Sequence, residues 1–153
     1  MPTQLQLDLV EDALLALLQS KVAAAKVRTA TSEDFDLDGE LIAVPPLVLV
    51  VFAAETPDPR RDHLRLTYQS QQQFKIFIGA TNLRGASHER KDAYALVNQV
   101  RDAVAGAKLT LAGGERLPPL ALGPTQLGRL DRNGTWYETR VILDGIAQFT
   151  VKE

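Results

Sequence analysis

The stretch from Phe74 to Gly106 constrains the fold of this 153-residue chain more than any other. Phe74, Ile76 and Ile78 alternate with Lys75 and Phe77, which is the period of a strand with at least one buried face. After a short linker, apolar residues recur at helical spacing and form one stripe: Ala93, Leu96, Val97, Val100 and Val104. Ser87 is suited to cap the start of this helix, and Gly106 to its left-handed end. A strand followed by an amphipathic helix predicts a helix packed on a sheet.

The other segments complete an α+β domain that spans residues 1–153. Residues 5–25 have an apolar stripe at helical spacing, and residues 26–31 form a short edge strand. Residues 47–54 are apolar without alternation, which indicates a central strand covered on both faces. Residues 63–78 predict one long bent strand, with a bulge or a loop at its polar middle. Residues 120–130 and 135–151 form a hairpin around Asn133-Gly134. We expect a mainly antiparallel sheet of about four to five strands with two helices packed on it.

Composition and motifs argue against an enzyme. The chain has no cysteine and only two histidines, His63 and His88, so thiolate chemistry and a histidine-built metal site are disfavoured. No Gly-x-Ser-x-Gly elbow and no Gly-x-x-x-x-Gly-Lys phosphate loop occurs. The apolar run over residues 41–54 is too short to span a bilayer, and the N-terminus has no signal-peptide pattern. We therefore predict no catalytic residues, no cofactor, no metal and no membrane partner, and synthesis in a cytosol.

The most acidic stretch, Glu33 to Glu40, imitates the start of a calcium-binding EF-hand loop. Three aspartates occupy the first, third and fifth loop positions, and Gly39 the sixth. The match fails at the twelfth position, where Pro45 replaces the glutamate that would close the calcium shell. We expect a mobile, solvated loop, with calcium binding as the alternative.

A nucleic-acid-binding module is a second functional class that the sequence could represent. Arg60, Arg61, Arg84, Arg90 and Lys91 could gather into a local basic patch. The formal net charge of −2 gives no general attraction to phosphate, and no interleaved aromatics offer stacking platforms. A charged surface that keeps the chain soluble is the simpler interpretation.

The order of segments resembles the Mu-like prophage gene product 37 family, small proteins of myophage-type tails that are similar to tail terminators. Four pieces carry the resemblance: the helix at residues 11–18, the Pro-Leu-Val-Leu-Val strand at 46–50, the Asn-Leu-Arg-Gly corner at 82–85 leading into the 93–106 helix, and the C-terminal hairpin. The linker at residues 86–91 is more charged than the small, glycine-rich link expected there.

The resemblance implies a structural virion protein rather than an enzyme. A tail terminator forms a ring, commonly a hexamer, at the head-proximal end of a contractile tail. Its partners are then the tail tube and sheath proteins and the neck or head-completion proteins, with DNA only passing through the lumen. Asn82, Leu83 and Arg84 are the expected subunit contact, and the acidic loop could face the lumen and repel DNA. A neck or head-completion protein and a small regulatory nucleic-acid-binding module are the alternatives.

Overall fold

The computed structural model describes residues 7–22, 25–57, 67–81, 86–114, 116–130 and 134–150. Along the chain these residues form α1 (Leu7–Lys21), β1 (Lys26–Thr29), the 3-10 turn η1 (Ser32–Asp34), β2 (Leu47–Pro57), β3 (Thr67–Thr81), α2 (Ala86–Val104), β4 (Lys108–Thr110), β5 (Arg116–Pro119), β6 (Ala121–Leu130) and β7 (Gly134–Thr150).

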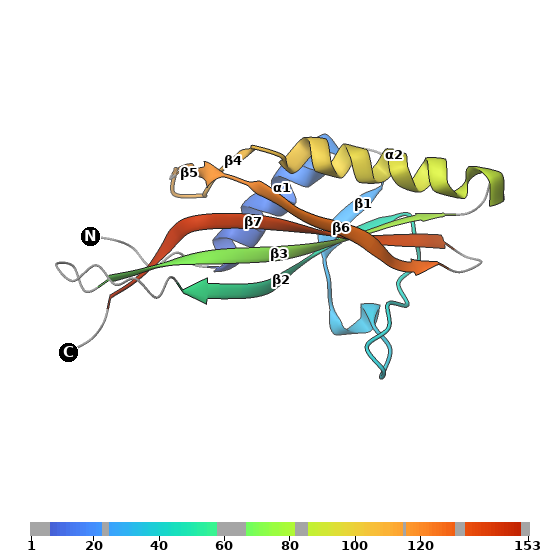
Figure 1. Ribbon diagram of the computed structural model, residues 1–153, viewed down its shortest axis with the longest axis horizontal. Helices are drawn as coiled ribbons and strands as arrows, with labels where there is room; N and C mark the ends of the chain where they lie inside the picture. Colours follow the sequence, from blue (N-terminus) through green and yellow to red (C-terminus); the bar gives the residue numbers. More distant parts are fainter. Residues whose placement is uncertain are drawn as a thin grey trace.

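The main sheet has five strands in the order β1-β2-β3-β7-β6 (Figure 1). The pairing of β1 with β2 is parallel and the other pairings are antiparallel, so the predicted α+β fold with a mainly antiparallel sheet is confirmed. Strands β4 and β5 form a separate two-stranded sheet. Strand β5 consists of the four residues Arg-Leu-Pro-Pro, which carry no strand signal in the sequence.

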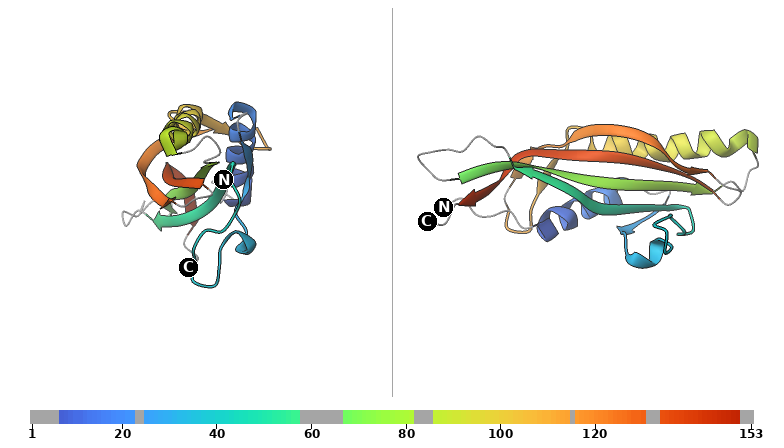
Figure 2. Two further views of the ribbon diagram at one scale, coloured as in Figure 1. Left: turned by 90° about the vertical axis from the view of Figure 1, so that its right-hand side faces the viewer. Right: turned by 60° about the horizontal axis from the view of Figure 1, so that its bottom comes forward.

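Both helices cover one face of the main sheet, as Figures 1 and 2 show. The predicted stripe of α2, from Ala93 to Val104, is buried against Val48, Ile76 and other apolar side chains of β2, β3 and β7. Ser87 does not cap α2, since the helix begins one residue earlier and includes it. Gly106 does end the helix in the left-handed region, with φ of 70°. Its N–H donates to the carbonyl of Leu120 at 2.9 Å, which ties the helix end to the start of β6.

The opposite face of the sheet carries a second, smaller core. Leu41, Leu47, Leu49 and Trp136 are buried together there, with Phe35 and Phe77 packed against them. The first half of β2 is therefore covered on both faces, as its unbroken apolar run predicts. Its second half is not, because the β2 side chains at positions 51–56 are half-buried or exposed.

Strand β3 is long and bent, as predicted, although residues 63–66 of the expected strand lie outside the described residues. Its register against β7 shifts between Ser70 and Gln72, which is the expected bulge. Both of these side chains are buried on the helix-covered side. Within the described residues, Ser70 Oγ and Gln72 Oε1 have no hydrogen-bond partner. The polar middle of the strand is thus covered on one face despite its composition.

The C-terminal hairpin is also confirmed, with Leu130 opposite Thr135 at its closed end. The turn at residues 131–133 lies outside the described residues. Of its two strands only β6 is a sheet edge, because β7 lies between β3 and β6. Where the structure is described, it contains no helix of the length and apolarity that crossing a membrane requires.

Candidate functional site: the excursion and the groove beside it

Between β1 and β2 the chain leaves the sheet and returns over residues 31–46, a segment we call the excursion. It projects from the side of the sheet opposite α2 (Figures 1 and 2). At its base, the guanidinium of Arg28 donates two hydrogen bonds to the carboxylate of Asp34, at 2.8 and 2.5 Å. The same carboxylate accepts the backbone N–H of Thr31 at 2.7 Å. These three contacts fix the start of the excursion to the end of β1.

The contact with Arg28 lowers the pKa of Asp34 to about 2, against an ordinary value of 3.8. Burial acts in the opposite direction, and the backbone of Thr31 adds a further stabilising hydrogen bond. The pKa of Arg28 is raised by the same hydrogen bond with Asp34. The expectation of a freely solvated acidic loop is therefore wrong for Asp34, whose side chain is only 5% exposed. An arginine six residues earlier neutralises it, and a paired carboxylate can be buried.

The far end of the excursion is held by its own hydrogen bonds. Asp36 Oδ1 accepts the backbone N–H groups of Asp38 at 3.0 Å and Glu40 at 2.8 Å. Phe35 and Leu41 form an isolated antiparallel bridge across this turn. Of the three aspartates that imitate a calcium loop, one is bound to Arg28 and another holds the turn. Across the described ranges, no group of three or more histidine, aspartate or glutamate residues is placed to hold a metal ion.

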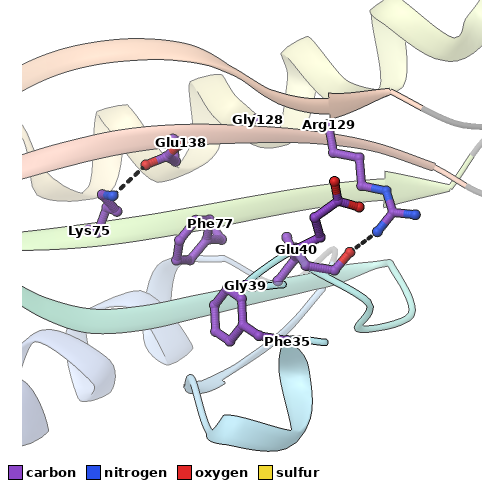
Figure 3. Close-up of a pocket in the computed structure, with 9 residues that line it drawn as sticks. Phe35, Gly39, Glu40, Lys75, Phe77, Gly128, Arg129 and Glu138 are labelled. Atoms are coloured by element: carbon purple, nitrogen blue, oxygen red, sulfur yellow. Dashed lines mark hydrogen bonds and ion pairs between the residues drawn. The ribbon is translucent and has the colours of Figure 1, made fainter. Parts of the chain in front are cut away.

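A groove of about 460 Å³ lies between the excursion and the outer face of the sheet (Figure 3). Its floor holds Phe77, which meets Phe35 edge to face with the ring centroids 5.7 Å apart. Lys75 on β3 forms an ion pair with Glu138 on β7 at 2.9 Å. Arg129 on β6 donates to the carbonyl oxygen of Leu41 and so bridges the sheet edge to the excursion. The other lining residues are Gly39, Glu40 and Gly128.

Three large aliphatic side chains of the excursion project into solvent. Leu37 at the tip is fully exposed, Val44 is 82% exposed and Ile42 is 50% exposed. The acidic pattern of this segment predicts no role for these three residues. The signal was available, because aliphatic residues in a short acidic loop must either fold back onto the core or remain in water.

The two edges of the main sheet are β1, which the sequence predicted as an edge strand, and β6 of the C-terminal hairpin. The N–H of Ala30 donates a hydrogen bond to the carbonyl oxygen of Val50 on β2. Because backbone groups of alternate residues point to opposite sides of a strand, the carbonyls of Val27 and Thr29 point away from β2. These two carbonyls accept hydrogen bonds from the side chains of Gln19 and Arg28, each at 3.1 Å. The outward carbonyls of β1 are thus already hydrogen-bonded.

The other edge strand, β6, is irregular in its pairing with β7. Its register against β7 shifts between Leu122 and Thr125 and again between Leu127 and Arg129. Pro124, inside the first of these irregularities, has no N–H to donate. Bulges and edge prolines are features that keep an edge strand from pairing with another chain. Neither edge therefore presents a long uninterrupted row of free backbone groups.

The predicted subunit contact, formed by Asn82, Leu83 and Arg84, lies outside the described residues. The same holds for Arg60 and Arg61 of the expected basic patch. Its other members, at positions 90 and 91, belong to α2, but their side chains are not among those described.

Comparison with known proteins gives a match of structure. No protein-family model matches the sequence. No curated protein matches it either. Among solved structures, the chain is similar to one from the virion of a native gene transfer agent particle, with a TM-score of 0.55 and 18% sequence identity. The similarity covers 90% of this chain and 96% of that one. The chain thus shares the fold of that virion chain over nearly the whole length of both.

Proposed function

We propose that this protein is a structural component of a phage-like virion. The observation that carries the proposal is the structural match to a virion chain, because it spans 90% of one chain and 96% of the other. A match of that extent spans most of the fold rather than one shared motif. At 18% identity the fold is the common element, so the role is inferred from it and from the sequence resemblance together.

Within the virion, the role we propose is that of the tail terminator. The protein would form a ring, a hexamer according to the resemblance, at the head-proximal end of a contractile tail and join that tail to the neck. The sequence resemblance to the Mu-like prophage gene product 37 family supports this position. A terminator must contact its own copies around the ring, the tail below it and the neck above it. The excursion and the outer sheet face provide surfaces beyond those that the two helices bury.

Ring closure requires heterologous contacts, in which unlike surfaces of neighbouring copies meet. The hydrogen-bonded edge of β1 and the interrupted edge of β6 favour contacts between side-chain surfaces over a sheet that continues from copy to copy. In this arrangement the tail tube and sheath proteins lie on one face of the ring and the neck proteins on the other. DNA passes through the lumen.

Deletion of the gene in cells that produce the particle tests the proposal. Loss of a terminator should leave heads and tails unjoined, with tails of irregular length, because nothing caps the growing tube. Electron microscopy of the lysate measures both effects, and expression of the wild-type chain from a plasmid should restore joined particles. Unjoined heads beside tails of normal length would indicate a neck or head-completion protein. Normal particles that lack this chain would contradict a structural role.

A further inference from the structure

We propose that the excursion is a docking element, in which Leu37 at its tip and Ile42 and Val44 on its return pack against an apolar surface rimmed by lysine or arginine on a different chain of the particle. The identity of that chain as a virion component rests on the proposed function above. The docking chemistry rests on the exposure, rigidity and charge of the excursion.

The first observation is the concentration of exposed apolar surface. Among the described residues, five large hydrophobic side chains are exposed, and three of them lie within the eight positions from 37 to 44. Single exposed aliphatic residues are common on protein surfaces and need no explanation. Here they cluster on one projecting segment, and Leu37 at 106% exposure makes no packing contribution to its own fold. Such a cluster is typical of a surface that is buried in a complex.

The second observation is that the excursion is already shaped for binding. The ion pair between Arg28 and Asp34 fixes its first turn, and Asp36 closes its tip. Arg129 fixes its return through the carbonyl oxygen of Leu41. A segment held in this way loses little conformational freedom on binding, so more of the contact energy remains as affinity.

The third observation is charge. Glu33, Asp38 and Glu40 are exposed around the aliphatic cluster, and residues 31–46 contain no lysine or arginine. A partner surface that accepts the aliphatic side chains is therefore favoured if it places cations around them, since like charges brought together at an interface are unfavourable.

The groove of a second copy of this chain is a poorer pocket for these side chains. Lys75 and Arg129 are the cations that line the groove beside the excursion. Lys75 is paired with Glu138, and Arg129 is bonded to the excursion of its own chain. The charge of this groove is thus already engaged, which favours a basic pocket on a different protein.

A competition experiment that measures incorporation of variant and wild-type protein into the particle tests the inference. Wild-type protein and a variant, carrying different tags, are produced together in particle-forming cells that lack their own copy. The double variant Leu37→Ser/Val44→Ser should enter purified particles at least about tenfold less than wild type, a change that corresponds to about 1.4 kcal/mol. Its melting temperature should equal that of wild type, because the two side chains are exposed. Leu37→Met, which keeps the apolar volume, is the matched control and should enter like wild type.

A photo-crosslinking residue at position 37 identifies the occupant. The expected product joins this chain to a different virion protein, at a site bordered by lysine or arginine. Equal incorporation of the double variant, or crosslinks only to a second copy of this chain, would overturn the inference while leaving the virion role intact. Absence of wild-type protein from the particles would instead refute the proposed function, and with it the partner named here.

Discussion

Arg28 and Asp34 join the edge strand β1 to the 3-10 turn that follows it, through two hydrogen bonds of 2.8 and 2.5 Å. The carboxylate is buried, whereas the guanidinium is 34% exposed. The same arginine donates to the carbonyl of Thr29, so one side chain binds an outward carbonyl of β1 and anchors the start of the excursion.

Acid should weaken this anchor in a defined pH range. The pKa of Asp34 is lowered in the folded protein from 3.8 to about 2, so its stabilising contribution is complete above the unfolded value and is lost as the pH falls through the folded one. The shift corresponds to about 1–2 kcal/mol at neutral pH, after allowance for the partly exposed guanidinium. Urea unfolding at pH 7 should show Asp34→Asn to be less stable than wild type by about this amount, and the difference should shrink near pH 2.

The exposed Asp38 provides the control for this experiment. Asp38→Asn should unfold at the same urea concentration as wild type at both pH values, because its side chain is exposed. An Asp34→Asn variant as stable as wild type at pH 7 would show that the ion pair does not hold the excursion.

The second prediction concerns Val100, which is fully buried in α2 against the sheet. Val100→Asp would place an unpaired carboxylate in the main core, at a cost comparable to the whole stability of a domain, so no soluble folded protein is expected. Val100→Ala should fold but lose about 1–3 kcal/mol in urea unfolding. The neighbouring Gln99 is exposed, and Gln99→Glu should behave like wild type. A soluble Val100→Asp variant that melts cooperatively would contradict the assigned face of α2.

The third prediction uses the close approach of Gly79 to the ring of Trp136. A Cβ at position 79 would lie 2.7 Å from three ring atoms of the tryptophan, which is itself buried. Gly79→Ala must therefore displace the ring and should cost about 1–3 kcal/mol. Trp136 is the only tryptophan of the chain, so its fluorescence reports the displacement directly. Gly113→Ala is the control, since nothing lies within 4 Å of an added Cβ there. An unchanged emission spectrum in Gly79→Ala would refute this packing.

Periodicity predicted the parts of this fold that local sequence determines. The α2 stripe and the alternation from Phe74 to Ile78 each come from one segment with one buried face, and both are confirmed. The hairpin also followed from a local signal at Asn133-Gly134.

The features that the sequence analysis missed depend on distant contacts. Burial of Asp34 requires its ion pair with Arg28. The second core requires Trp136 on β7 to pack over Gly79, its partner on the neighbouring strand β3. The groove and the exposed aliphatic cluster exist only once the excursion is placed beside the outer sheet face. Composition alone describes the excursion as an acidic loop, and does not distinguish the aspartate that is buried from those that remain in water.

The fourth prediction is that calcium does not stabilise the protein. Asp34 is bound to Arg28, Asp36 accepts two backbone N–H groups, and the position of the closing ligand is a proline. Addition of millimolar calcium should leave the melting temperature unchanged in differential scanning fluorimetry, and so should addition of a chelator. A calcium-dependent rise of several degrees, abolished in Asp36→Asn, would restore the calcium-loop interpretation of residues 34–45.

The last prediction concerns the contacts between copies in the proposed ring. A density map of assembled particles should show six copies of this chain around the head-proximal end of the tail, joined by heterologous contacts. Because Gln19 and Arg28 already bind the outward carbonyls of β1, and Pro124 interrupts β6, side chains rather than a continuous sheet should join the copies. A ladder of main-chain hydrogen bonds from β1 of one copy to β6 of the next would contradict this packing. A single copy without ring symmetry, or a position elsewhere on the particle, would refute the terminator role.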